Sequence, residues 1–205
     1  MIFLAKYSLT TPLTKEDILN LNIGDIVHLN GTIYTARDEA HIHILRDLKN
    51  GRKIDLSLEG AAIFHCGPII KKINGGWNVV AAGPTTSSRM NLLEPEFIKR
   101  THVRAIIGKG GMSKSVSDSM TKFGAVYFAT TGGTAVLTAD RITAVKGVYL
   151  EDLGMPEAVW ILEVNNFGPL IVGIDAKGNS LFEEIKSRVE KNLPHTLQKL
   201  GLQNA

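Results

Sequence analysis

Short apolar runs alternate with segments of helical spacing along most of the chain, and glycine-rich or hydroxyl-rich turns separate them. The clearest case is VRAIIGKGGMSKS, residues 103–115, where an apolar run enters a turn of three glycines and one lysine before a helical pattern begins. A chain that alternates strands and helices in this way folds into a sheet with helices packed on it. We therefore expect an α/β fold.

Hairpin signals predict that the sheet is mixed. Asn74-Gly75-Gly76 separates two strand-like runs and is a strong hairpin signal. Thr14 and Asp17 predict a capping box, and Asn179 is a plausible cap for the last helix. We expect helices at residues 14–24, 37–49, up to 100 with a restart at Pro95, 113–123, 133–141 and 180–192. We expect strands at residues 25–34 (one bent strand or a pair), 63–73, 77–82, 103–107, 125–131, 158–164 and 169–175. Residues 1–205 are expected to form a single domain with this mixed sheet and flanking helices.

The charge pattern argues against a nucleic-acid partner. The formal net charge is only +3, and the basic residues are scattered among acidic ones. No apolar run approaches the roughly 18 residues of a spanning helix. The N-terminal segment MIFLAKYSLTTP lacks the flanks of a signal peptide. We expect no nucleic-acid partner, no membrane partner and a cytoplasmic location.

Metal-ligating residues are sparse. Cys66 is the single cysteine, which excludes an internal disulfide and a cysteine-rich cluster held by this chain alone. Any iron–sulfur chemistry would need thiolates from a partner. His41 and His43 form an H-x-H pair, but residues two apart on a helix face different sides and would not share an ion. We therefore assign no metal ligand to this chain.

Arg37 and His41 start one expected helix and lie four residues apart on one face. Backbone N–H groups at a helix start favour an anion, which Arg37 could bind while His41 exchanges a proton. The simpler alternative is a capping arginine beside a solvated histidine.

The turn GPTTSSRM, residues 83–90, brings four hydroxyls and Arg89 to the start of the next helix. These groups can cap the free N–H groups of the helix or line an anion pocket. Capping needs one or two hydroxyls, so the remaining ones favour a binding site.

The GKGG turn, residues 108–111, allows several interpretations. Its lysine is misplaced for a phosphate-binding Walker loop, and Ser113 stands where a dinucleotide fingerprint has its third glycine. A KH-type RNA-binding loop is similar, but that family forms the loop between two helices and has an apolar residue at the position of Lys114. What remains is a glycine nest between a strand and a helix, with Lys109 adding positive charge.

Three cations therefore lie near turns that can bind anions: Arg37, Arg89 and Lys109. They suit a small acid with two carboxylates, because each charge-assisted contact contributes roughly 1.5–3 kcal/mol and fixes orientation. A nucleotide site would also need a magnesium carboxylate and an adenine slot, and the sequence shows neither.

Five ordered motifs, ARDEAH, HCGP, GPTTSSRM, GKGGM and GMPEAVWILEV with DAKGNSLF, span nearly the whole chain. With them the sequence resembles the beta subunit of the two-subunit, iron–sulfur class I fumarate hydratases and the closely similar tartrate dehydratase beta subunits. The resemblance implies a swivelling β/β/α domain. It also implies an alpha subunit whose cysteines hold a 4Fe-4S cluster with one open iron, an active site at the interface of the two subunits, and a two-alpha two-beta assembly.

The resemblance also implies roles for individual residues. Arg37, Arg89 and Lys109 match the positions that bind the substrate carboxylates, and Thr85 matches the base that takes the C3 proton of malate. His41 matches a histidine that is an alternative acid–base residue. The implied reaction is the reversible hydration of fumarate to malate, a step of the tricarboxylic acid cycle. Tartrate dehydration is the alternative, and RNA binding by the GKGG turn is an alternative of another class.

Overall fold

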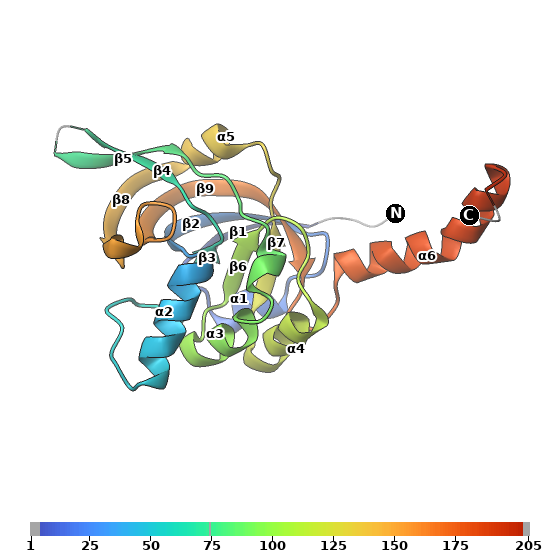
Figure 1. Ribbon diagram of the computed structural model, residues 1–205, viewed down its shortest axis with the longest axis horizontal. Coiled ribbons are helices and arrows are strands. Elements are labelled where there is room, and N and C mark those ends of the chain that lie inside the picture. Colours follow the sequence, from blue (N-terminus) through green and yellow to red (C-terminus); the bar gives the residue numbers. More distant parts are fainter. Residues whose placement is uncertain (1–4, 74, 203–205) are drawn as a thin grey trace.

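The computed structural model describes residues 5–73 and 75–202 (Figure 1). Asn74, the first residue of the expected hairpin turn, lies outside the described residues, as do residues 1–4 of the segment that lacks signal-peptide flanks. Across the described ranges, no helix combines the length and the apolar character that crossing a membrane requires.

Five strands close into a ring, which the long strand β9 completes. β2 (Ile26–Thr35), β3 (Ala62–Phe64), β6 (Ala105–Gly108) and β7 (Val126–Ala129) pair in parallel, each with the next. β9 (Val159–Ile174) runs antiparallel to β7 along one edge and to β2 along the other. The sheet therefore mixes both pairings, and the expected mixed α/β architecture is confirmed.

Two further strands extend this sheet, and a hairpin stands apart from it. β1 (Lys6–Thr10) pairs in parallel with β2, and β8 (Ile142–Tyr149) pairs antiparallel with β9. The hairpin of β4 (Ile69–Ile73) and β5 (Gly76–Ala81) forms a separate two-stranded sheet, as expected.

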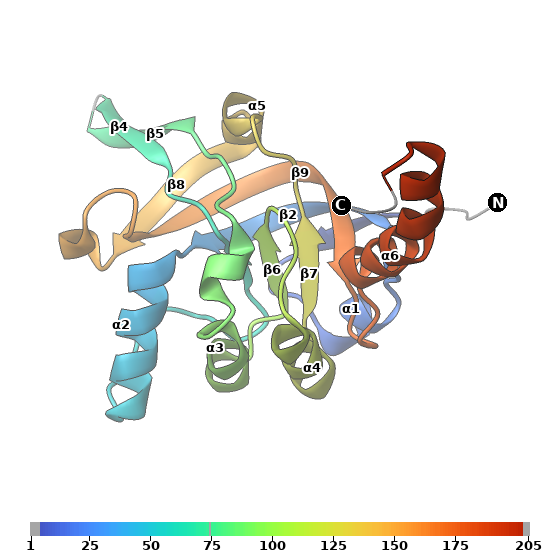
Figure 2. The same ribbon diagram turned by 45° about the vertical axis from the view of Figure 1, so that its right-hand side comes forward.

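Alternation along the strands divides the apolar residues between two cores. Phe64 and Phe128 belong to the core inside the ring, together with residues of β2 and β9. Their neighbours, such as Ile63 and Tyr127, face outward against three helices. These are α2 (Asp38–Lys49), α3 (Glu94–Thr101) and α4 (Lys114–Phe123), which lie side by side along the sheet in Figure 2.

Several expected boundaries needed correction. The run 63–73 is two strands, β3 and β4, because Cys66 pairs with Pro84 between them. The last two expected strands are one continuous β9, and neither β1 nor β8 was expected. The segment expected at residues 25–34 is one irregular strand, β2 (Ile26–Thr35), with register shifts on either side of Leu29.

The helices differ from expectation mainly at their ends. The Thr14 and Asp17 capping box is confirmed, but its helix α1 (Lys15–Leu19) is short. A 3₁₀ turn (Ser87–Met90) precedes α3, and α5 (Ala135–Ala139) is a single short helix. The last helix, α6 (Leu181–Lys199), runs beyond residue 192, and Ser180 caps it, not Asn179.

Helix α6 projects away from the sheet (Figures 1 and 2). Its first turn is anchored by Phe182, whose ring centroid lies 6.3 Å from that of Tyr127. An added Cβ on Gly111 would meet Phe182 Cγ at 2.9 Å, so this ring also packs on the GKGG turn. Helix α6 thus contacts the loop that carries Lys109.

Candidate functional site

The carboxyl ends of β2, β3 and β6 meet at one edge of the sheet, where ligands of α/β proteins commonly bind. The GPTTSS segment enters between the ends of β3 and β6. Thr85 N–H donates to the His65 carbonyl (2.6 Å), Lys109 N–H to the Thr85 carbonyl (3.3 Å), and Ser87 N–H to the Lys109 carbonyl (3.0 Å). Backbone pairing therefore brings Thr85 beside Lys109, and both side chains remain half-buried.

Arg37 lies over the turn that follows β3. Its Nε is 3.2 Å from Glu157 Oε1, and a Cβ built on Gly67 would lie only 2.6 Å from Arg37 Nη1. The HCG turn that supports Arg37 also accepts the hydrogen bond of Thr85. Arg37 and Thr85 are thus held by the same turn.

Arg89 is held by the residue that follows Arg37. Arg89 Nη2 lies 2.7 Å from Asp38 Oδ2, and Arg89 Nε donates to Asp38 Oδ1 at 3.2 Å. Both arginines are therefore paired with acids, Arg37 with Glu157 and Arg89 with Asp38, at partly exposed positions. Exposed pairs of this kind contribute only about 0–1 kcal/mol, so an incoming carboxylate can replace either acid. Within the described ranges, Lys109 has no carboxylate oxygen within 4.0 Å.

His41 lies beneath Arg37 and is fully buried. Its Nδ1 donates to the Arg37 carbonyl at 2.7 Å, and its ring packs against Phe97 with centroids 4.4 Å apart. The expected pairing of His41 with Arg37 on one helix face is present, but through the backbone of Arg37. His41 as a proton-transfer residue stays a prediction, and its burial places it behind the surface that Thr85 reaches.

A buried cluster of polar side chains, His41, His65, Ser87, Glu94 and Tyr127, lies under these loops. Glu94 Oε2 is 3.0 Å from His65 Nε2 and 3.5 Å from His41 Nε2. His65 Nδ1 is 2.9 Å from Ser87 Oγ. The Tyr127 hydroxyl lies 3.0 Å from Ser87 Oγ and 2.9 Å from the carbonyl oxygen of Gly110.

The charges inside this cluster follow from burial and contact. Burial alone would raise the pKa of Glu94, but the two histidines outweigh it and lower that pKa to about 2. Burial lowers the pKa of His65, and Glu94 does not offset it. For His41 the charge and hydrogen bond of Glu94 outweigh the effect of burial, and the pKa is raised. Burial and contact therefore favour an ionised Glu94, a charged His41 and a neutral His65.

Two kinds of metal-binding side chain occur near the site, a group of two histidines with a glutamate, and a cysteine. His41, His65 and Glu94 converge and could by residue type hold an ion. Cys66 is fully buried, and burial raises the pKa of its thiol to about 12 although Arg37 acts to lower it. A thiol in that state is not a thiolate ligand, so this chain does not fit an iron–sulfur cluster of its own.

Sequence reasoning missed the buried cluster. The HCGP motif contains His65 and the GPTTSSRM turn contains Ser87, but the sequence does not show that these two side chains are in contact. Glu94 lies in the first turn of α3, where acids are common, so its sequence position does not distinguish it from an ordinary surface acid. Burial of all three at 0% exposure depends on the packing of helices from distant parts of the chain.

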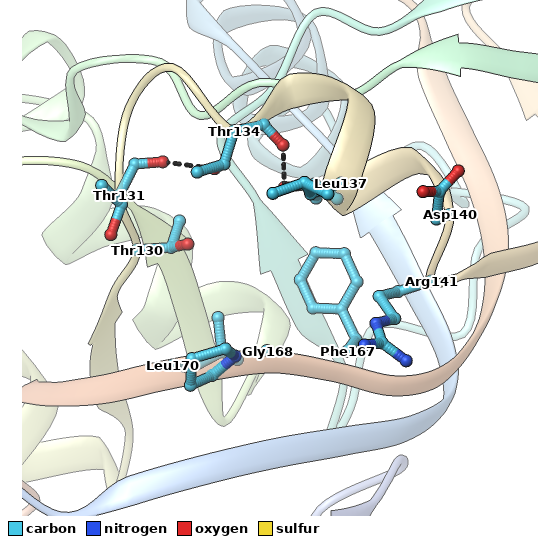
Figure 3. Close-up of a pocket in the computed structure, with 11 residues that line it drawn as sticks. Thr130, Thr131, Thr134, Leu137, Asp140, Arg141, Phe167, Gly168 and Leu170 are labelled. Carbon is cyan, nitrogen blue, oxygen red and sulfur yellow. Dashed lines mark hydrogen bonds between the residues drawn. The ribbon is translucent and has the colours of Figure 1, made fainter.

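A cavity of about 530 Å³ lies next to the site, beyond β7. Figure 3 shows the ring of Phe167 between the loop of Thr130 and Thr131 and helix α5, with Arg141 at the far side. The described residues that line it include none of the expected site residues. Thr130 N–H nevertheless donates to the Gly108 carbonyl at 2.8 Å, so the cavity adjoins the GKGG turn.

The GKGG turn connects strand β6 to helix α4. A KH-type loop lies between two helices, so the observed connection disfavours RNA binding in that mode. Two positions of this turn require glycine for different reasons. Gly110 has a left-handed φ of 73°, and a Cβ on Gly108 would lie 1.9 Å from Ser87 Oγ.

Comparison with known proteins gives a consistent result. Residues 4–185 match the family model described as Fumarase C-terminus. A protein of Methanocaldococcus jannaschii, provisionally named L(+)-tartrate dehydratase subunit beta, is 54% identical over 88% of this chain and 93% of its own length. L(+)-tartrate dehydratase subunit beta of Escherichia coli (strain K12) is 44% identical over 88% of this chain and 89% of its own length. A Geobacillus stearothermophilus protein, provisionally named class I fumarate hydratase, is 42% identical over 90% of this chain, which spans 35% of that protein.

Proposed function

Because this chain belongs to the Fumarase C-terminus family, we propose that it is the beta subunit of a hydro-lyase that adds water to fumarate and removes it from malate. The observation that carries the proposal is the convergence of Arg37, Arg89 and Lys109 with Thr85 at one edge of the sheet. Three cations around one hydroxyl suit a substrate with two carboxylates and a proton to be removed between them.

The cations bind and orient the substrate. Arg37 and Arg89 exchange their acidic partners, Glu157 and Asp38, for substrate carboxylates, and Lys109 adds a mobile positive charge. When a proton leaves C3 of malate, the neighbouring carboxylate gains negative charge. Fixed cations stabilise that charge without reorganisation, which lowers the barrier of the chemical step.

Thr85 is the proposed proton acceptor at C3. Its N–H and carbonyl are both engaged by the backbone of neighbouring loops, so its position is fixed while its hydroxyl remains available. A threonine hydroxyl is a weak base and needs activation by a nearby charge. Lys109, whose backbone N–H contacts the Thr85 carbonyl, is the candidate for that activation.

An alpha subunit is the proposed partner, in a two-alpha two-beta assembly. The single, buried thiol of this chain leaves cluster binding to that subunit. A 4Fe-4S cluster held there would supply the Lewis acid for the C2 hydroxyl that leaves. The site residues described above would then face the alpha subunit across the interface.

Dehydration of L-tartrate is a second candidate. It is favoured by two relatives, 54% and 44% identical, that carry that name. Both reactions remove a proton beside a carboxylate and a hydroxyl from the neighbouring carbon, so one cationic clamp serves either. Assaying the complex with malate, fumarate and L-tartrate distinguishes them by kcat/KM.

The test is anaerobic co-expression of this chain with a cysteine-bearing alpha subunit. We expect the chain alone to be inactive and the complex to be active. Lys109→Ala removes one charge-assisted contact of roughly 1.5–3 kcal/mol, which lowers kcat/KM about 10- to 150-fold. Lys114→Ala is the matched control, because the Lys114 side chain is 82% exposed and, among the described residues, its one ion pair is with Asp118 on its own helix. Activity of the isolated chain, or an unchanged Lys109→Ala complex, contradicts the proposal.

A further inference from the structure

The buried cluster spans the three loops that carry the candidate site. At one end, His41 Nδ1 donates to the Arg37 carbonyl at 2.7 Å. At the other end, the Tyr127 hydroxyl reaches the carbonyl oxygen of Gly110, next to Lys109, at 2.9 Å. Ser87, between them, lies in the segment that carries Thr85. The loops are therefore joined by side chains as well as by their backbones.

Hydrogen-bond chemistry fixes where the protons lie. A carbonyl only accepts, so His41 Nδ1 carries hydrogen. His41 Nε2 lies 3.5 Å from Glu94 Oε2, and a second hydrogen there agrees with the raised pKa of His41. With a hydrogen on Nε2, which lies 3.0 Å from Glu94 Oε2, a neutral His65 accepts from the Ser87 hydroxyl through Nδ1. The cluster thus holds one imidazolium, one carboxylate and one neutral imidazole.

The charges around His41 come from several elements. Glu94 of α3 and His65 after β3 face it directly, and Asp38 on its own helix acts at longer range. Tyr127 of β7 carries no charge, because burial raises the pKa of its phenol. Within the described ranges, His41 Nε2, His65 Nε2 and both carboxylate oxygens of Glu94 are buried and form no aligned hydrogen bond, so these groups meet at contact distance only.

The backbone next to Ser87 leaves space for its hydroxyl. A Cβ on Gly108 would lie 1.9 Å from Ser87 Oγ, so a glycine at this strand end leaves room for the hydroxyl. Gly108 precedes Lys109 directly, so the contact also sets where the GKGG turn leaves the sheet.

A buried ion pair is a poor source of stability, because desolvation offsets most of its attraction. Such groups are better explained by a fixed geometry that the fold requires. The 3.0 Å between His65 Nε2 and Glu94 Oε2 is short enough for direct contact between the two groups.

We infer that the buried cluster is a positioning device: Glu94, His41, His65, Ser87 and Tyr127 set the spacing of the loops that carry Arg37, Thr85 and Lys109. All five side chains are fully buried, so they act through the loops that they hold. This inference rests on the proposed function for its kinetic part, but the proton arrangement belongs to the chain itself. Small displacements of positioned groups can lower a rate about 100-fold, so the device matters for turnover.

The first test needs no activity. Nitrogen-15 NMR of the full chain resolves the protonation of each histidine ring. We expect His41 to be protonated on both nitrogens at pH 6.5 and His65 on Nε2 alone. A singly protonated His41 at pH 6, or one equivalent of tightly bound metal per chain, overturns the inference.

The second test uses the complex with the alpha subunit. Glu94→Gln and Tyr127→Phe are expected to lower kcat at least about tenfold, with a smaller change in KM, at temperatures where both variants are folded. In Glu94→Gln the pH profile of kcat should also gain a histidine ionisation. Glu96→Gln on the exposed side of α3 and Tyr149→Phe on β8 are the controls, and both should stay within twofold of wild type.

The outcomes separate the two proposals. Folded Glu94→Gln and Tyr127→Phe complexes with kcat within twofold of wild type overturn the positioning role, even if Lys109→Ala is impaired. A wild-type complex inactive on malate, fumarate and L-tartrate overturns the proposed function. In that case the NMR pattern of His41 and His65 still decides whether the cluster is built as inferred.

Discussion

Gly67 is the residue on which the position of Arg37 depends. A methyl group there would lie 2.6 Å from Arg37 Nη1 and 2.8 Å from the carbonyl oxygen of Pro156, closer than real contacts allow. The backbone at Pro156 cannot move aside as a long side chain can, so the Arg37 guanidinium must shift.

We therefore predict that Gly67→Ala raises KM for the dicarboxylate at least about tenfold, since it displaces one charge-assisted contact. Steady-state kinetics of the complex with the alpha subunit measure this KM. The control is Gly147→Ala on β8, where the added methyl meets only Ile161 Cδ1 at 3.6 Å. Equal KM values for the two variants would show that Arg37 does not bind substrate from this position.

At this scale the sequence predicts charges better than contacts. The sequence places Arg37, Arg89 and Lys109 beside glycine and hydroxyl turns, where cations commonly bind anions, and their role in binding substrate stays a prediction. The acids that hold two of them, Asp38 and Glu157, were not identifiable, because an exposed carboxylate carries no sign of its partner. A pair separated by more than 50 positions forms only after the sheet is assembled.

Only a small part of helix α6 packs against the rest of the protein. Phe182 packs on Tyr127 and Gly111, whereas no residue of the helix is fully buried and Val189 is 57% exposed. Tertiary contacts therefore come almost entirely from the first turn.

We predict that Phe182→Ala lowers the free energy of unfolding by about 1–3 kcal/mol, less than a fully buried phenylalanine would lose. It should also lower activity, because its ring supports the GKGG turn. Val189→Ala, on the exposed length of the same helix, should change stability by less than about 0.5 kcal/mol. Urea titrations of both variants make the comparison, and equal losses would contradict it.

Elements were predictable where local signals were strong. The capping box of α1, the hairpin and the strand, turn and helix around Lys109 all have such signals, and the structure confirms them. β8 was missed because its sequence, ITAVKGVY, has a glycine and a lysine and little alternation, and its pairing partner is β9. Its pairing with β9, and not its own propensity, makes it a strand.

At the scale of the whole molecule, the buried cluster links stability to pH. Glu94 has a pKa lowered from 4.5 to about 2, so its contribution is complete above pH 4.5 and is lost as the pH falls towards 2. The pKa of His65 is lowered from 6.5, so its contribution is lost as the pH falls below 6.5. The pKa of His41 is raised from 6.5, so its contribution is present below 6.5 and is lost as the pH rises through the raised value.

We predict that Glu94→Gln lowers the free energy of unfolding at pH 7 by about 3–5 kcal/mol, because it leaves a buried charge unpaired. It should also flatten the fall in stability between pH 4.5 and 2, because the ionisation of Glu94 is then absent. Denaturant unfolding at several pH values measures both, with Glu96→Gln as the control on the exposed side of α3. Parallel pH curves for the two variants would contradict the assignment of charges.

Strand β9 has a consequence for how the molecule is made. It joins the ring by pairing with β2, which lies more than 120 positions earlier in the chain. Contacts of such long sequence separation form slowly, and a chain emerging from the ribosome cannot make them until its later part is synthesised. The loops of Arg37, Thr85 and Lys109 are translated well before β9, so nascent chains expose open strand edges until β9 closes the ring. During synthesis, protection of those edges falls to chaperones or to early encounter with another subunit.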